Sequence, residues 1–157
     1  MPKVLALFFG ADNSGGAVAE AAAEGAKGIR FAEVDVRAAG SGESKHKRVA
    51  SAHAVSHYDG VVLIAGDSDM SPELATLLDE LQREPRVANI VFGLSGFTPE
   101  LVGRVARLGG ILVGVPHGTG PGNDARGDAV ALGARVAKVC GWVRHALGHE
   151  AEHSHAH

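Results

Sequence analysis

The sequence predicts a three-layer, doubly wound α/β fold built on a five-stranded parallel sheet of strand order 2-1-3-4-5. Four apolar runs have the composition of strands that helices cover on both faces, and they occupy residues 4–9, 61–65, 89–94 and 111–115. Segments with helical periodicity alternate with these runs, as in βαβ units joined by right-handed crossovers. A fifth run, residues 29–36, alternates apolar and polar residues imperfectly, which favours a position at the sheet edge.

The predicted helices between these strands have apolar residues spaced three and four apart along the chain. The first helix is rich in alanine and ends near Ala26. Further helices are expected at residues 72–82, 99–108 and 124–149, and a weaker one at residues 44–54. The chain therefore repeats the unit of one strand and one helix five times.

A length of 157 residues suits one domain with its own core, which we expect at residues 1–147, followed by a His-rich tail at residues 148–157. The net charge of −3 gives no indication of nucleic-acid binding, and the basic run at residues 45–48 is typical of a solvated loop. No apolar run is long enough to span a membrane. The single cysteine, Cys140, fits a reducing compartment, so we expect a cytoplasmic protein.

Ligands of doubly wound sheets bind at the carboxyl ends of the strands, beside the point where the strand order reverses. That point lies here between the first and third strands, so we expect a small-molecule ligand above them. The loops that surround it are residues 10–16, 66–71, 95–98 and 116–123. No motif of a catalytic nucleophile and no nucleotide-binding Walker loop is present, and the catalytic residues stay unknown.

The opening residues 3–26 read as a strand, a loop of Gly, Asn and Ser, and a helix that ends in the sequence AEGA. This opening resembles the flavodoxin-like NAD(P)H:quinone oxidoreductases of the WrbA type. Similar segments are YDGVV at residues 58–62, LGGILVGVP at 108–116 and ALGARVA at 131–137. The resemblance covers most of residues 3–140 and implies a flavodoxin-like fold and an FMN cofactor that passes hydride from NAD(P)H to a quinone.

The resemblance also implies the residues of an FMN site. Asn13, Ser14 and Gly15 are expected to hold the phosphate, and the ring is expected against Phe97 and the loop that begins at Gly66. The full predicted cofactor site comprises Gly10, Asp12, Asn13, Ser14, Gly15, Gly66, Asp67, Ser68, Ser95, Gly96, Phe97 and His117.

The sequence departs from the family at this site. Gly10 stands where the family has a hydroxyl residue, and Asp12 stands where it has a neutral side chain. A carboxylate about 4 Å from a phosphate costs on the order of 1–4 kcal/mol. The loop at residues 66–71 lacks the Arg and the aromatic residue that the family has in its ring-binding loop. We therefore expect FMN binding to be weakened or lost, and the alternative is a non-flavin ligand-, metal- or partner-binding protein on the same fold.

Two sets of residues have the chemistry of metal ligands. Asp12, Asp67, Asp69 and Asp124 lie on loops at one sheet edge, in partial resemblance to the acidic pocket of receiver domains, and oxygen ligands suit a hard cation. A second set, His145, His149 and His153, is spaced four residues apart, so a continuous helix would align these imidazoles for a divalent metal. The alternative for this second set is a solvated tail.

Two further expectations concern a homo-oligomer and a helix end. The run at residues 111–115 is apolar yet lies at a predicted sheet edge, and apolar edges are usually covered, so we expect a homo-oligomer.

His53 and His57 also stand four residues apart, and we expect them to end a helix before the third strand.

Overall fold

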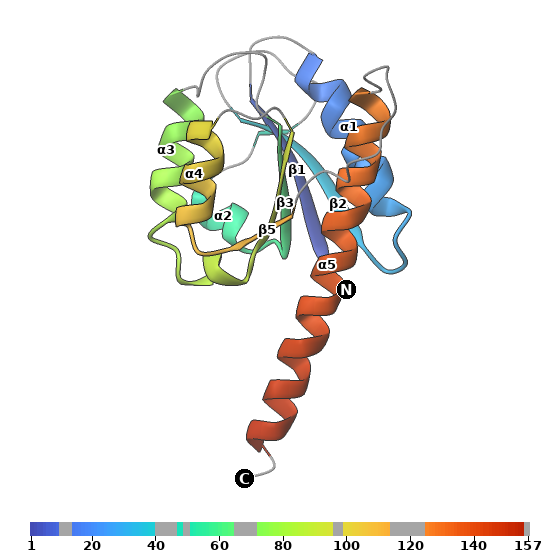
Figure 1. Ribbon diagram of the computed structural model, residues 1–157, viewed down its shortest axis with the longest axis vertical. Helices are drawn as coiled ribbons and strands as arrows, with labels where there is room; N and C mark the ends of the chain where they lie inside the picture. Colours follow the sequence, from blue (N-terminus) through green and yellow to red (C-terminus); the bar gives the residue numbers. More distant parts are fainter. Residues whose placement is uncertain are drawn as a thin grey trace.

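The computed structural model describes residues 1–9, 14–39, 47–48, 51–64, 72–95, 99–113 and 125–155, with the backbone alone at residues 14, 125 and 149–155. These residues form one parallel sheet of order β2-β1-β3-β4-β5 (Figure 1). The strands are β1 (Lys3–Phe9), β2 (Glu33–Ala39), β3 (Gly60–Ile64), β4 (Val91–Ser95) and β5 (Ile111–Val113). The predicted fold class and strand order are confirmed.

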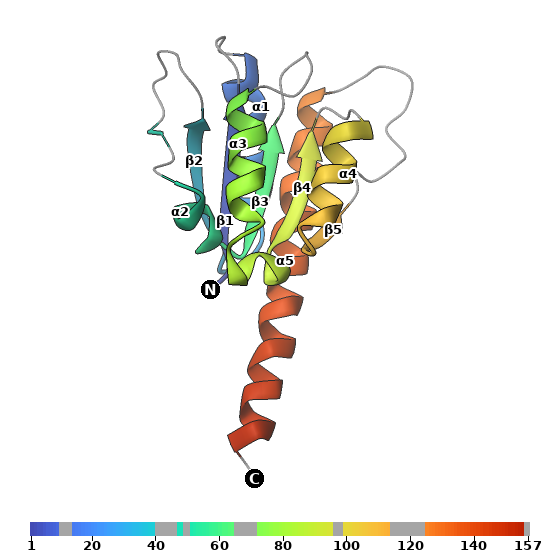
Figure 2. The same ribbon diagram turned by 90° about the vertical axis from the view of Figure 1, so that its left-hand side faces the viewer.

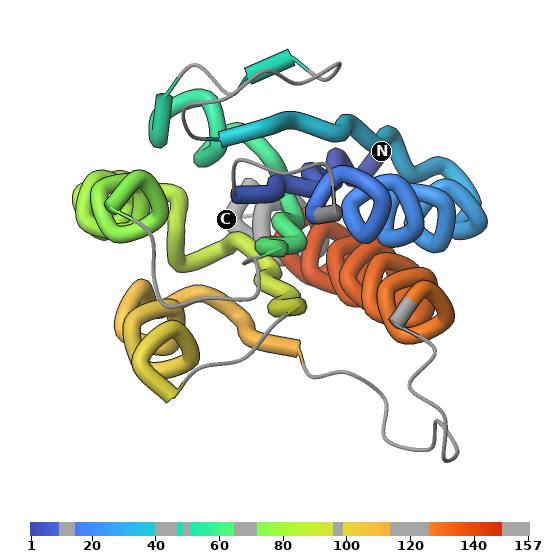
Figure 3. Tube along the Cα trace, turned by 90° about the horizontal axis from the view of Figure 1, so that it is seen from above, coloured from blue at the N-terminus to red at the C-terminus, as the bar shows by residue number. Residues whose placement is uncertain are grey.

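Helices cover both faces of the sheet. They are α1 (Ser14–Lys27), α2 (Ala52–Ser56), α3 (Pro72–Leu81), the 3₁₀ helix η1 (Pro85–Asn89), α4 (Pro99–Arg107) and α5 (Ala125–His155). Figure 3 shows α1 and α5 side by side on one face, with α2, α3 and α4 on the other. The predicted helices at residues 72–82 and 99–108 correspond to α3 and α4 within one residue.

The alternation of side chains along the central strands divides the core into two unequal halves. Leu5 and Leu7 of β1 pack toward α3 and α4, with Phe92 of β4. The intervening Val4 and Ala6 pack toward α1 and α5, against a layer made largely of alanine. The core on the α1 and α5 side is therefore built from small residues, which lets these two helices lie close to the sheet and to each other.

Two predicted elements begin four or more residues later than expected. The second strand begins at Glu33 rather than at residue 29, because the chain turns after α1 and Phe31 adopts a positive φ of 68° with its ring exposed. The weak helix expected at residues 44–54 is a shorter helix, α2, that begins at Ala52. Arg48, inside the expected helix, instead forms a parallel bridge with Ala38 at the end of β2.

Helix α2 begins and ends with defined hydrogen bonds. Ser51 caps it, since its Oγ accepts a hydrogen bond of 3.1 Å from the backbone N–H of Ala54. His57 is the C-cap and follows the last helical residue. The expectation that His53 and His57 end a helix before β3 is therefore confirmed.

Glycines bring the backbones of α1 and α5 into contact. A Cβ added at Gly25 of α1 would overlap the carbonyl oxygen of Val130, and one added at Gly133 of α5 would overlap the carbonyl oxygen of Ala22. Each glycine thus lies against the backbone of the other helix, and a larger residue at either position would force the helices apart. An ion pair between Arg126 and Glu24 joins the same two helices at their surface.

Helix α5 is 31 residues long and extends past the amino edge of the sheet (Figures 1 and 2). Its backbone continues through residue 147, so part of the predicted tail is helical, and the division into a domain at residues 1–147 and a tail at 148–157 stays a prediction. Among the described residues, no helix combines the length and the hydropathy that a bilayer crossing requires.

Substituting Gly133 by Ala tests the contact between the two helices. We expect a loss of about 1–3 kcal/mol or more in the free energy of unfolding, because the added methyl group meets backbone rather than an adaptable side chain. Gly141→Ala, on the same helix, is the matched control, since a Cβ there has open space around it. This control should raise stability by about 0.5–1 kcal/mol. Denaturant unfolding measures both values, and equal effects of the two variants would contradict the packing described.

Candidate functional site

The carboxyl ends of the central strands and the beginnings of the helices meet at one edge of the molecule. β1 ends at Phe9, β3 at Ile64 and β4 at Ser95, and Ile64 and Ser95 are register partners. The next helices along the chain, α1, α3 and α4, begin at the same edge (Figure 2). The predicted location of the site therefore coincides with an edge where helix N-termini gather, and free backbone N–H groups at such ends attract anions.

The first turn of α1 differs from that of the other long helices. It contains no acidic residue, whereas the first turns of α3, α4 and α5 contain Glu73, Glu100 and Asp128 respectively. A carboxylate in the first turn stabilises a helix by interacting with the positive end of its dipole. Helix α1 therefore lacks this internal counter-charge at the end of the central strand, and it has the better N-terminus for an external anion.

Three of the predicted site residues lie at this edge. Ser14 is the first residue of α1, and Gly15 is buried in the first turn. A Cβ on Gly15 would lie 3.4 Å from the Cβ of Phe8, so the start of α1 rests against the end of β1. Ser95 is half-buried at the end of β4. The remaining predicted cofactor residues, which lie outside the described part of the chain, are Gly10, Asp12, Asn13, Gly66, Asp67, Ser68, Gly96, Phe97 and His117.

The two metal predictions stay untested. All four aspartates of the predicted cation site, Asp12, Asp67, Asp69 and Asp124, lie outside the described residues. Of the tail histidines, the side chain of His145 is described and exposed, whereas at His149 and His153 only the helical backbone is described. Within the described side chains, no group of three His, Cys, Asp or Glu residues is placed to hold a metal ion.

A groove of about 460 Å³ lies on the α2 and α3 side, next to the end of β2. Its lining combines small and apolar residues with three charged ones, and comprises Ala38, Ala39, Arg48, Ser51, Ala52, Pro72, Glu73, Thr76, Leu77 and Glu80. None of these residues belongs to the predicted site. The sequence carried only a weak signal for it, because Arg48 belongs to the basic run interpreted as solvated loop.

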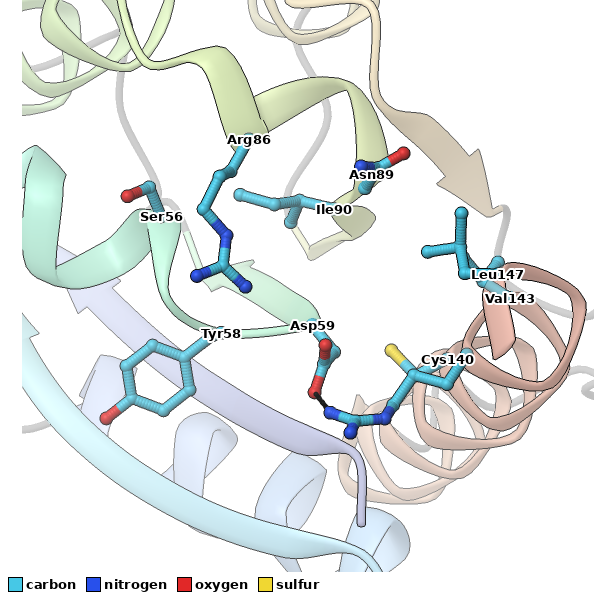
Figure 4. Close-up of a pocket in the computed structure, with 10 residues that line it drawn as sticks. Ser56, Tyr58, Asp59, Arg86, Asn89, Ile90, Cys140, Val143 and Leu147 are labelled. Atoms are coloured by element: carbon cyan, nitrogen blue, oxygen red, sulfur yellow. Dashed lines mark hydrogen bonds and ion pairs between the residues drawn. The ribbon is translucent and has the colours of Figure 1, made fainter. Parts of the chain in front are cut away.

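A smaller pocket of about 80 Å³ lies at the opposite, amino edge, between β3, η1 and α5 (Figure 4). The carboxylate of Asp59 on its wall accepts hydrogen bonds from the backbone N–H of Lys3 at 2.8 Å and from Arg144 at 3.0 Å. The thiol of Cys140 also lines this pocket but is buried, and burial, followed by the charge of Asp59, raises its pKa to about 12. A thiol that stays protonated at neutral pH is a poor nucleophile, so the pocket has no activated cysteine.

Tyr58 joins the start of β3 to β2. Its hydroxyl donates a hydrogen bond of 2.7 Å to Asp35, whose other oxygen lies 3.8 Å from Arg37. Burial of the ring raises the pKa of Tyr58 to about 12, and the bond to Asp35 adds to this effect because it stabilises the protonated phenol. The phenol is therefore neutral over the physiological range and acts as a structural tie.

Titration of the phenol tests this tie, since Tyr58 is the only tyrosine of the chain. Tyrosinate absorbance should appear near pH 12 in the folded protein, well above the ordinary value of 10.0. The folded-state pKa is the higher one, so the tie stabilises the fold fully below about pH 10 and is lost as the pH rises through about 12. Asp35→Asn should lower the midpoint, whereas Asp79→Asn, which removes a surface carboxylate elsewhere, should leave it unchanged. A native midpoint near 10 would refute the assignment.

The structure is similar to solved flavodoxins and flavodoxin-like proteins. A short-chain flavodoxin associated with a non-canonical PDU bacterial microcompartment has a TM-score of 0.64 and 13% identity, covering 89% of this chain and 99% of its own. A diflavin flavoprotein A3 from Nostoc sp. has a TM-score of 0.59 and 15% identity, covering 95% and 99%. A flavodoxin-like domain from Synechococcus sp. has a TM-score of 0.55 and 17% identity, covering 86% and 96%.

Sequence comparison adds no family to this result, because no protein-family model and no curated protein sequence matches the chain. Likeness at such low identity concerns the path of the backbone and not the activity. Strand order, parallel pairing and the near-complete coverage of the solved structures agree, and the protein has a flavodoxin-like fold.

Proposed function

We propose that the protein binds FMN at the carboxyl edge of its sheet, with the phosphate at the N-terminus of α1. The observation that carries the proposal is the first turn of α1, which is separated from β1 by four residues and contains no acidic side chain. Backbone N–H groups and a positive dipole end suit a phosphate. The flavodoxin-like fold supports the same location, since FMN-binding proteins share it.

The residues of the chain have separate tasks in this proposal. The N–H groups of the first turn of α1, including Ser14 and Gly15, would bind the phosphate, and Asn13 would add a side-chain donor. Phe8 fixes the helix start, because its buried side chain lies against Gly15 in the first turn of α1. When bound, FMN supplies the redox chemistry, and the resemblance to quinone oxidoreductases points to hydride transfer from NAD(P)H to a quinone.

The affinity for FMN in this proposal is lower than in the WrbA-type proteins, because Asp12 brings a carboxylate into the phosphate loop. The alternative function keeps the edge as a binding site for a different small molecule. The groove beside α3 favours an occupant with cationic or hydrogen-bond-donor groups, since Glu73 and Glu80 outnumber the single basic residue of its lining, Arg48. Binding of added FMN, followed by its fluorescence, separates these two functions.

The variant Ala17→Asp tests the phosphate site with two readouts of opposite sign. Ala17 is exposed in the first turn of α1, so a carboxylate there should stabilise the helix by about 0.3–1 kcal/mol. The same charge should repel a bound phosphate by about 1–2 kcal/mol, or roughly 5- to 30-fold in the dissociation constant. FMN titration and thermal unfolding measure the two effects.

Ala106→Asp is the matched control, because Ala106 is an exposed alanine near the C-terminal end of α4. It should leave FMN affinity unchanged. Unchanged FMN affinity in Ala17→Asp would place the phosphate elsewhere, and the absence of FMN binding by the parent protein up to millimolar concentration would favour the non-flavin alternative.

We also propose that two copies of the chain associate through the edge strand β5. Ile111 and Leu112 are 37% and 39% exposed, although both are large and apolar. An edge strand presents unpaired backbone donors and acceptors, and the same strand of a second copy, related by a two-fold axis, offers matching groups in antiparallel register. A second copy would thus cover apolar side chains and backbone groups together.

Light scattering or sedimentation equilibrium tests this association by mass. We expect a parent species of about twice the monomer mass of 16.1 kDa, and the monomer in Leu112→Lys, because a charge at the strand edge opposes pairing. Phe31→Lys, which replaces an exposed apolar residue away from β5, should keep the parent mass. A monomeric parent at high micromolar concentration would exclude the association.

A further inference from the structure

A chain of polar side chains lies at the amino edge of the sheet, opposite the proposed FMN site. Helix α2 carries His53, and His57 follows one turn later at its C-cap, so both imidazoles lie on the same side of the helix. Glu84 and Arg86, from the segment that leads into β4, contact the Nδ1 atoms of these rings. Figures 1 and 2 show α2 low beside the strands, away from the edge where α1 begins.

The two imidazoles face each other through the same ring atom. Nε2 of His57 lies 3.2 Å from Nε2 of His53, and the rings meet edge to face, with centroids 4.7 Å apart and planes at 89°. Two nitrogens bound to one tetrahedral Zn²⁺, at about 2.0–2.1 Å each, lie roughly 3.3 Å apart. The spacing of the pair therefore already matches that of two ligands on a single metal ion.

Glu84 orients one of the two rings for such a role. Its carboxylate lies 3.4 Å from Nδ1 of His53, and the side chain is mostly shielded from solvent, at 23% exposure. A histidine that binds metal through one nitrogen usually donates its other N–H to a carboxylate, which fixes the tautomer and raises the basicity of the ligating atom. Glu84 thus favours the tautomer of His53 in which Nε2 carries the lone pair.

Arg86 favours the other tautomer in His57, in which Nε2 carries the proton. One of its guanidinium nitrogens lies 3.1 Å from Nδ1 of His57. Arginine only donates hydrogen bonds, so Nδ1 of His57 accepts, and the proton of the neutral ring resides on Nε2. That Nε2–H donates to His53, and the hydrogen bonds run in one direction from Arg86 through His57 and His53 to Glu84.

We propose that His53 and His57 form a two-imidazole site for a borderline divalent cation, Cu²⁺, Ni²⁺ or Zn²⁺, with water in the other coordination positions. The cation replaces the proton between the two Nε2 atoms. The proton of His57 moves through solvent from Nε2 to Nδ1, and Arg86, which is exposed, turns away. Glu84 is a positioning residue for the site, and Arg86 opposes metal binding. Imidazole ligands suit these cations, and Cu²⁺ binds most strongly in the series.

The experiment uses the full-length chain in which the five tail histidines, from His145 onward, are replaced by Gln, so that they do not compete. Zn²⁺ binding is measured by calorimetry, and Cu²⁺ coordination by electron paramagnetic resonance. His53→Gln and His57→Gln should each weaken binding at least tenfold and remove the imidazole signature from the Cu²⁺ spectrum. Circular dichroism checks that each variant is folded.

Variants of Glu84 and Arg86 distinguish a metal site that its neighbours support from two exposed histidines that bind metal on their own. Glu84→Gln should weaken Zn²⁺ binding about tenfold, the lower end of the range for partners of metal ligands. Arg86→Gln should strengthen binding roughly threefold or more, because it removes a competing donor and a positive charge. Arg83→Gln, which removes an arginine from the same segment, is the matched control and should change affinity little.

Two outcomes would overturn the proposal. One is equal metal affinity in the parent and in the double variant His53→Gln/His57→Gln. The other is an Arg86→Gln variant that binds no more tightly than Arg83→Gln, since the direction of the hydrogen bonds requires Arg86 to oppose the cation. Neither readout depends on FMN, so failure of the proposed FMN site leaves this test unaffected.

Discussion

The close approach of α1 and α5 is the constraint on which the rest of the structure depends. Gly25 and Gly133 each leave room for the backbone of the opposite helix, and the alanines of α1 fill the remaining space. Because α1 is held by backbone contact rather than by long side chains, its axis has little freedom relative to the sheet. The position of its first turn, and therefore of the proposed phosphate site, follows from a contact made two to three turns further along the helix.

The same constraint explains the unequal halves of the core. Glycines also stand in the strands beneath α5, where a Cβ at Gly93 would press on Val136 and Leu132. The α3 and α4 side instead buries Leu, Val and Phe, and there the helices lie on large side chains. Helices thus pack close to the strand backbone on one face of the sheet and on large side chains on the other. Each strand therefore needs small residues toward α1 and α5 and large residues toward α3 and α4.

Local patterns were sufficient to predict most of the fold. Continuous apolar runs identified β1 and β3 because these central strands are buried on both faces, and the spacing of leucines identified α3 within one residue. The start of β2 was misplaced because Phe31 looks like a strand residue but lies exposed in a turn with positive φ. Helix α2 was misplaced because five residues are too few to establish a helical period.

The candidate sites were predictable only in part, and for a physical reason. The location at the carboxyl edge follows from topology alone, and Ser14, Gly15 and Ser95 lie there, while the other predicted cofactor residues fall outside the described chain. The contacts of His53 and His57 with Glu84 and Arg86 span about thirty residues of sequence and arise only when the turns before β3 and β4 meet. No periodic pattern in the sequence predicts these contacts.

The length of α5 also affects how the molecule moves through solution. At 31 residues the helix is about 46 Å long, and its last turns extend beyond the sheet without a partner layer among the described elements. A rod attached to a compact body increases friction more than it increases mass. The protein should therefore diffuse and tumble more slowly than a sphere of the same mass, and size estimates based on elution volume alone will exceed the true mass.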